Sequence, residues 1–119
     1  MRSSPKKALL MDINTINSVC VKYLGENINI FLYGSYGANQ GGWVLDNKYY
    51  YPYNDYDILI LKDTTKNEDF NLLPIIKKEL LDNIQVRFID LSLNSHSKME
   101  SLKPTVENFV IINASKQIF

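Results

Sequence analysis

The sequence has little that would cross-link the chain or carry it into a membrane. Cys20 is the single cysteine and lies among apolar residues at helical spacing, which excludes a disulfide framework and a thiolate metal site. No apolar run approaches the roughly 20 residues of a spanning helix, and residues 8–11 are too short for a signal-peptide core. We therefore expect a soluble, cytoplasmic protein with no membrane contact.

The chain also lacks an excess of charge of either sign. Thirteen basic and thirteen acidic side chains give a formal net charge of zero, so we expect no stable nucleic-acid binding through a broad field of phosphate contacts. A small charged ligand bound with a metal ion remains compatible with this balance. With 119 residues, 45% of them hydrophobic, the chain has the size of one domain, which we expect to span residues 1–119.

The spacing of hydrophobic residues predicts alternating helices and strands. The predicted elements are a helix at 12–24 ended by Gly25, a strand at 29–33, a hairpin insertion at 41–52, a strand at 56–61, a helix at 68–82 interrupted at Pro74, a strand at 85–93, a helix-like tail at 97–113 and a strand at 116–119. The inward residues expected on the second long helix are Phe70, Leu73, Ile76, Leu80 and Leu81. This order predicts an α/β or α+β domain with a small mixed β-sheet flanked by helices. The apolar end at 117–119 is compatible both with a complete chain and with the N-terminal part of a longer parent protein.

Three aspartates are candidate metal ligands. Asp55 and Asp57 stand two apart at the entry to strand 56–61, and the strand period of two directs both carboxylates to one face. Two such anions repel each other unless a cation lies between them, and Mg²⁺ or Mn²⁺ is suited to that position. Asp90 lies in the apolar register of strand 85–93, where burying a lone carboxylate is costly. If the two strands are neighbours, the three carboxylates suit two metal ions that clamp a phosphoryl group.

A small polar turn after strand 29–33 is a candidate phosphate site. Gly34 lets a phosphate chain approach the backbone, and the Ser35 hydroxyl and backbone N–H groups can face an anion. No basic residue follows in this turn, where Ala38 and Asn39 stand. We expect Arg87 to be exposed or ion-paired.

Two segments, 32–37 (Leu-Tyr-Gly-Ser-Tyr-Gly) and 54–59 (Asn-Asp-Tyr-Asp-Ile-Leu), together resemble the nucleotidyltransferase fold of the DNA polymerase beta superfamily. The resemblance is closest to its small minimal-nucleotidyltransferase-like domains. The shared pattern is an apolar strand, Gly-Ser, a helix, and Asp-x-Asp on the next strand. The resemblance implies Mg²⁺-dependent transfer of a nucleoside monophosphate from an NTP, with AMP from ATP as the expected case, to a hydroxyl of a protein or small-molecule acceptor.

The same resemblance implies a role for each candidate residue. Gly34 and Ser35 would hold the β and γ phosphates, and Asp55 and Asp57 would bind metal. Asp90 stands at the third carboxylate position, which can ligate metal and take the proton of the acceptor. The 41–52 insertion departs from the compact family spacing, and many relatives carry a basic residue where Ala38 and Asn39 stand.

Two further readings stay open. The chain can be a catalytically weak or inactive nucleotide- or partner-binding module of the antitoxin type, with a helical partner protein or a second copy as its partner. The aromatic side chains around the insertion can stack on a base or sugar, or pack on their own sheet or on a dimer mate: Trp43, Tyr49, Tyr50, Tyr51, Tyr53 and Tyr56. Template-dependent polymerisation is disfavoured by the neutral charge. We expect His96, the single histidine, to be exposed in a polar loop.

Overall fold

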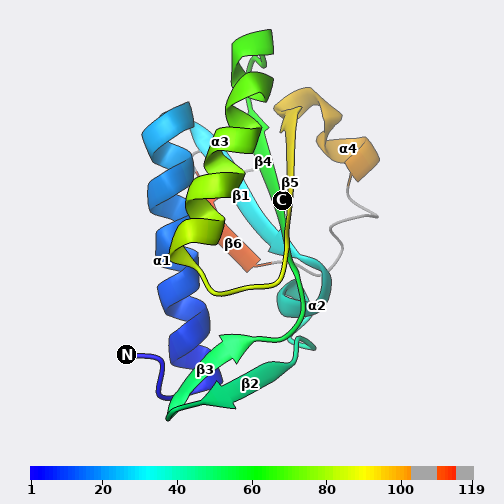
Figure 1. Ribbon diagram of the computed structural model, residues 1–119. Coiled ribbons are helices and arrows are strands. Elements are labelled where there is room, and N and C mark those ends of the chain that lie inside the picture. The colour runs from blue at the N-terminus through cyan, green and yellow to red at the C-terminus, as the bar shows by residue number, and fades with distance from the viewer. Residues whose placement is uncertain (103–109, 115–119) are drawn as a thin grey trace.

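The computed structural model describes residues 1–102 and 110–114, and these form an α+β fold, as predicted (Figure 1). The elements are α1 (Pro5–Leu24), β1 (Ile28–Tyr33), α2 (Gly34–Gly37), β2 (Trp43–Asp46), β3 (Tyr49–Pro52), β4 (Tyr56–Lys62), α3 (Asn67–Asn83), β5 (Ile89–Ser95), a 3-10 turn (His96–Lys98), α4 (Met99–Leu102) and β6 (Val110–Ala114). Four strands form a mixed sheet in the order β5-β4-β1-β6, and β2 and β3 form a separate hairpin. Within the sheet β4 and β5 are parallel, whereas β1 is antiparallel to both β4 and β6.

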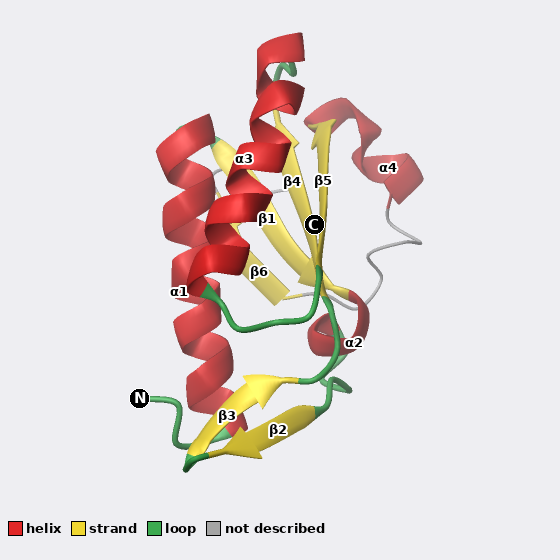
Figure 2. Cartoon of the chain, viewed as in Figure 1, coloured by secondary structure: helices red, strands yellow, loops and turns green. Residues whose placement is uncertain are grey.

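The main core lies between the sheet and two long helices. Figure 2 shows α1 and α3 side by side over the sheet, with the hairpin beyond the end of the sheet where α2 lies. Alternate residues of β4 point to the two faces, so Ile58 and Ile60 join the core under the helices. Leu59 and Leu61 pack with Phe31 on the other face, against Leu102 of α4. Because both faces are covered, β4 is an almost continuous apolar run.

Helix α1 begins seven residues earlier than the predicted start at residue 12. Ser4 caps it, since its Oγ accepts a hydrogen bond from the Lys7 N–H at 3.2 Å, and Pro5 occupies the first turn. The predicted end at Gly25 is confirmed: this glycine has φ +87° and its N–H donates to the Val21 carbonyl. The lone thiol of Cys20 is buried in this helix, and burial raises its pKa to about 12.

Helix α3 runs without a break through Pro74, so the predicted interruption there is wrong. Pro74 is exposed and has no N–H to donate to the carbonyl of residue 70. Because this part of the helix faces solvent, that carbonyl can accept a hydrogen bond from water. Ile76 and Leu80 are buried as predicted, and Leu73 packs on the core. Phe70 and Leu81 were expected inward, but 44% and 37% of their surfaces are exposed, because the helix buries a narrower face than its apolar residues span.

The third predicted strand and the tail differ from expectation. Strand β5 begins at Ile89 and not at residue 85, since its pairing with β4 begins only where β4 begins. The helix predicted for 97–113 is wrong at β6, whose β-branched residues pair with the edge of β1. The predicted strand at 116–119 lies outside the described residues.

His96 is not exposed as expected. Its side chain is 10% exposed and lies between Asn29 and Asp63, with its Nε2 2.7 Å from Asn29 Oδ1 and its Nδ1 2.8 Å from Asp63 Oδ1.

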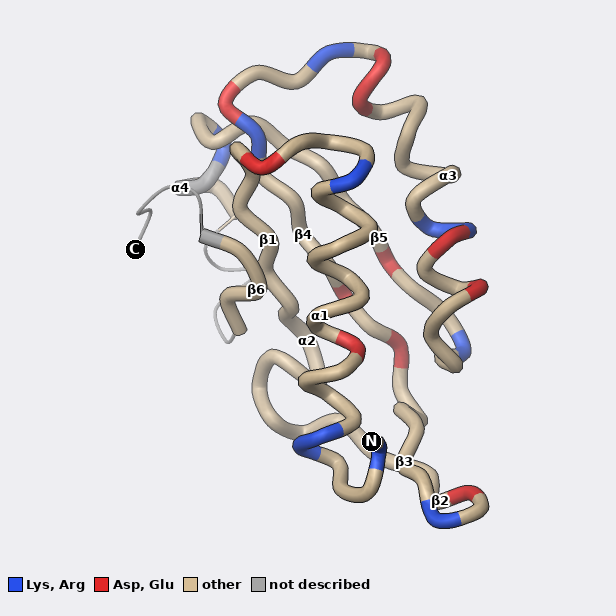
Figure 3. Tube along the Cα trace, turned by 90° about the vertical axis from the view of Figure 1, so that its left-hand side faces the viewer, with Lys and Arg blue, Asp and Glu red and all other residues tan. Residues whose placement is uncertain are grey.

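Acidic and basic positions are interspersed along the chain (Figure 3). None of the helices in the described part of the chain is long and apolar enough to cross a membrane.

Candidate functional site

Two of the predicted carboxylates are direct neighbours on adjacent strands. Asp57 on β4 is the register partner of Asp90 on β5, and on its other side it is the partner of Tyr33 at the end of β1. Paired strands lie about 4.8 Å apart, so the structure brings these two aspartates together at one end of the sheet. The same end carries the turn that follows Tyr33.

Both carboxylates lie on the face of the sheet away from α1 and α3. Tyr56 is fully buried in the core under the helices, so Asp57, the next residue, points to the opposite face. Ile89 is likewise buried, and Asp90 beside it is exposed. The predicted placement of Asp90 in a buried apolar register is therefore wrong, because Phe88 precedes the strand and is 43% exposed.

The turn at Gly34 is packed against Asp57. Gly34 has φ +68°, and a Cβ added to it would lie 2.1 Å from Asp57 Oδ2. Only glycine adopts this backbone conformation readily, and only a residue without a side chain leaves room for the carboxylate. Ser35 follows in α2, whose first-turn N–H groups have no partner within the helix itself. The predicted phosphate turn and the predicted metal ligand are thus in contact.

The carboxylates at this end of the sheet repel one another. The pKa of Asp57 lies above its ordinary value because its carboxyl group is partly buried and because Asp90 and Asp55 lie nearby. Both causes penalise the charged form, and a divalent cation relieves both. Carboxylate oxygens are the donors that Mg²⁺ prefers, so the chemistry of Asp57 and Asp90 is compatible with Mg²⁺, whose binding here stays a prediction.

Asp55 is held differently. Its Oδ1 lies 3.3 Å from Nε of Arg87, in the segment that precedes β5. Arg87 is therefore exposed and ion-paired, in agreement with the prediction. Within residues 1–102 and 110–114, no three His, Cys, Asp or Glu side chains are grouped so as to hold a metal ion. The structure thus brings Asp57, Asp90 and Gly34 together, whereas Asp55 pairs with a cation of the chain.

Tyr36 links the Gly34 turn to the start of β4, a contact that no pattern in the sequence predicts. Its hydroxyl donates to the Gly42 carbonyl at 2.6 Å and accepts from the Asn54 N–H at 2.9 Å. The Gly42 N–H donates in turn to Asn54 Oδ1 at 2.7 Å. The Tyr36 ring packs edge-on against Tyr56, with 4.9 Å between centroids. These contacts join the two ends of the hairpin insertion at its base.

A buried ionic network of Arg2, Asp12 and Tyr56 anchors β4 on the face of the sheet that α1 covers. Arg2 donates two hydrogen bonds to the Asp12 carboxylate, at 2.6 and 3.0 Å, and Tyr56 donates a third at 2.5 Å. Arg2 Nε also donates to the Tyr50 carbonyl in the hairpin. The signal for Asp12 was present in the sequence, since it lies on the apolar face of α1, four residues before the buried Ile16. A charged residue in that position is expected to have a partner.

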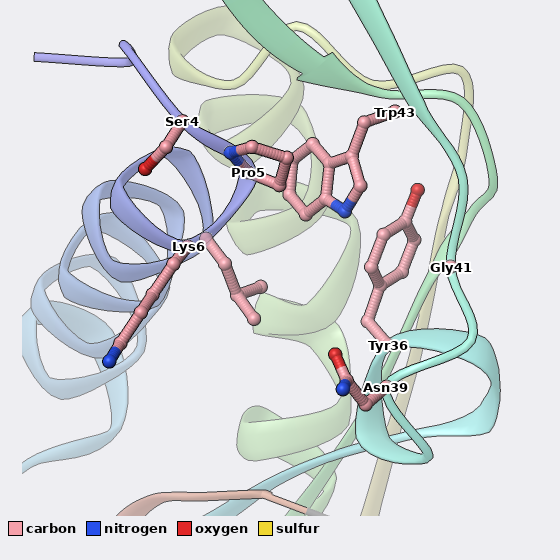
Figure 4. A pocket seen from close by; sticks show the side chains of 8 residues that line it. Ser4, Pro5, Lys6, Tyr36, Asn39, Gly41 and Trp43 are labelled. Carbon is pink, nitrogen blue, oxygen red and sulfur yellow. The ribbon is translucent and has the colours of Figure 1, made fainter.

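The aromatic residues of the insertion pack partly within the chain. Arg2 lies over the Tyr51 ring, 4.8 Å from its centroid, and the Tyr36 ring meets Trp43 edge-on at 5.2 Å. Trp43 also borders a cavity of about 590 Å³ between the start of α1 and the segment after α2 (Figure 4). This cavity lies beside α1, whereas the aspartates lie on the opposite face of the sheet. Packing on the chain is confirmed for Tyr51 and Tyr56, whereas Tyr53 is 60% exposed.

We expect Asp57→Asn to raise the free energy of unfolding of the metal-free protein at neutral pH. The pKa of Asp57 is raised in the folded chain, so the folded state binds this proton more tightly than the unfolded state does. The free energy of unfolding therefore falls as the pH rises from the ordinary Asp pKa of 3.8 through the higher pKa of the folded state. Asn does not titrate, so the variant does not lose this stability. Urea unfolding at about pH 3 and about pH 7 measures the difference.

The higher free energy of unfolding of Asp57→Asn at neutral pH should disappear at acid pH, where Asp57 is protonated in both the folded and the unfolded wild type. Asp46→Asn, an exposed carboxylate in the hairpin, is the control and should show no comparable gain. A destabilised Asp57→Asn at neutral pH would show that the carboxylate is already compensated in the metal-free protein.

Neither a family model nor a curated protein matches this sequence. Its function is therefore inferred from the geometry of the site.

Proposed function

We propose that the protein is a metal-dependent nucleotidyltransferase that transfers a nucleoside monophosphate, with AMP from ATP as the first case, to a hydroxyl of a protein or small molecule. The observation that carries the proposal is the contact between the Gly34 turn and Asp57, with Asp90 on the neighbouring strand. An anion-binding turn against a pair of carboxylates is an arrangement for phosphate and divalent metal together.

The residues of the chain divide the work. Gly34 and Ser35 bind the β and γ phosphates through backbone N–H groups and the Ser35 hydroxyl. Asp57 and Asp90, with Asp55 once it is released from Arg87, would hold Mg²⁺, which would neutralise negative charge on the phosphates. The acceptor hydroxyl oxygen forms a bond to the α-phosphorus, the bond to the β-phosphate oxygen breaks, and pyrophosphate leaves. Asp90 takes the hydroxyl proton, and its exposed position gives an acceptor access to it.

A second candidate is a module of the same fold that binds a nucleotide or a partner chain without turnover. The ion pair between Arg87 and Asp55 favours it, because one of the three carboxylates is not free for metal. The neutral residues after the Gly34 turn point in the same direction, since they leave the phosphates without a cation from α2. Nucleotide binding without transfer distinguishes this module from the enzyme.

We expect calorimetric titration with ATP in the presence of Mg²⁺ to show binding by the wild type and none by the double variant Asp55→Asn/Asp57→Asn. The two substitutions keep the shape of both side chains and remove the negative charges that hold the metal. A double variant at exposed carboxylates away from the site, Asp46→Asn/Asp82→Asn, is the matched control and should bind like the wild type.

Transfer of label from α-³²P-ATP to candidate acceptors then separates the two functions. Label on an acceptor, lost in Asp90→Asn, supports the enzyme, and binding without label supports the module. Absence of NTP binding by the folded wild type, tested with ATP and every other NTP and with both Mg²⁺ and Mn²⁺, would contradict the enzyme and the nucleotide-binding module and leave only a partner-binding domain.

A further inference from the structure

Arg87 is a basic residue in direct contact with the proposed site. Among the ion pairs of the described residues, it is the one basic side chain within 4.0 Å of Asp55, Asp57 or Asp90. The contact uses a single nitrogen, Nε, at 3.3 Å. Within the described ranges, neither terminal nitrogen of its guanidinium has a hydrogen-bond partner. Arg87 therefore keeps most of its donors available.

The backbone around Arg87 is fixed, whereas its side chain is not. The Tyr56 N–H donates to the Phe88 carbonyl at 3.2 Å, which fastens the segment before β5 to the start of β4. One face of the Phe88 ring contacts Lys77, whose Nζ lies 3.8 Å from the ring centroid. The Arg87 side chain itself is 69% exposed, so its guanidinium can move without opening the core.

The charges around Arg87 favour such a movement. An exposed ion pair is weak, because water screens both charges, and its separation costs little. A divalent cation at Asp55 would repel the guanidinium, and a nearby triphosphate would attract it. The planar guanidinium of Arg can donate two parallel hydrogen bonds to two phosphate oxygens.

We propose that Arg87 is a displaceable cation: it neutralises Asp55 in the ligand-free protein, and when metal and triphosphate bind it leaves Asp55 and binds the phosphates. This inference rests on the proposed function and assigns Arg87 as the phosphate-binding basic residue that the turn after Gly34 lacks. The ligand class that it recognises is a polyphosphate, independent of the base.

Two titrations test the displacement, with Mn²⁺ alone and with inorganic triphosphate in saturating Mn²⁺. We expect Arg87→Ala to bind Mn²⁺ alone about two- to fivefold more tightly, because the competing charge is gone. The same variant should bind triphosphate about tenfold more weakly, because a charge-assisted contact is lost. Arg87→Lys keeps the charge without the fork, so its Mn²⁺ affinity should resemble wild type and its triphosphate affinity should be intermediate.

Lys78→Ala is the matched control, since it removes a positive charge from an exposed ion pair on α3 and should change neither affinity. Unchanged or weaker Mn²⁺ binding by Arg87→Ala contradicts the competition at Asp55, and unchanged triphosphate binding contradicts the transfer. These results leave the proposed function intact if Asp55→Asn/Asp57→Asn abolishes metal binding. Absence of Mn²⁺ binding by both wild type and Arg87→Ala overturns the inference and the metal-dependent function together.

Discussion

Gly34→Ala should abolish metal and nucleotide binding and lower the free energy of unfolding by about 2 kcal/mol. The backbone at Gly34 has φ +68°, where a Cβ strains the chain, and the new methyl would lie 2.1 Å from Asp57 Oδ2. The Asp57 side chain is flexible enough to turn away, so we expect the fold to survive. The carboxylate would then leave the position in which it contacts the Gly34 turn. Calorimetry with Mn²⁺ and ATP, beside urea unfolding, measures both effects.

The chain provides a matched control for backbone strain. Gly25 ends α1 with φ +87°, and an added Cβ there meets no atom within 4 Å. Gly25→Ala should therefore destabilise the protein through the same kind of strain while leaving binding unchanged. If both variants bind normally, the contact between Gly34 and Asp57 has no part in ligand binding, and the main observation behind the proposed function fails.

Asp12→Ala should lower the free energy of unfolding by about 3 kcal/mol or more. The carboxylate of Asp12 is 3% exposed and receives three hydrogen bonds, two from Arg2 and one from Tyr56. Its removal leaves a guanidinium that is 13% exposed and a buried hydroxyl without their acceptor. Uncompensated buried charge is among the costliest single defects in a folded protein. Equilibrium unfolding in urea checks the magnitude.

The control is Asp82→Ala, which breaks the exposed pair with Lys78 and should change stability by less than about 0.5 kcal/mol. Because Tyr56 lies between Asp55 and Asp57 in the chain and donates to Asp12, we also expect Asp12→Ala to weaken metal binding. Asp12→Asn retains one acceptor oxygen and should lie between the alanine variant and wild type. Equal decreases in the free energy of unfolding for Asp12→Ala and Asp82→Ala would contradict a stabilising role for the buried network.

The sequence predicted those elements whose signals are local. The strand that ends before Gly34, the hairpin and the end of α1 at Gly25 follow from apolar runs, turn residues and a glycine at positive φ. The predictions failed where the deciding partner is distant. Strand β6 was predicted as helix because its apolar residues also suit a helix face, and only the open edge of β1 made it a strand. The start of β5 depended in the same way on where β4 begins.

For the candidate site, the sequence by itself determined which residues are candidates for binding phosphate and metal: a glycine and a serine after a buried strand, and aspartates two apart on another. Residue type and local spacing are enough for this, because the alternation of side chains along a strand places Asp57 on the face opposite Tyr56. The tertiary structure alone decided that Gly34 packs on Asp57, that Asp90 is exposed beside it, and that Arg87 reaches Asp55. These contacts join residues far apart in the chain, so they depend on strand order and register, which local patterns do not encode.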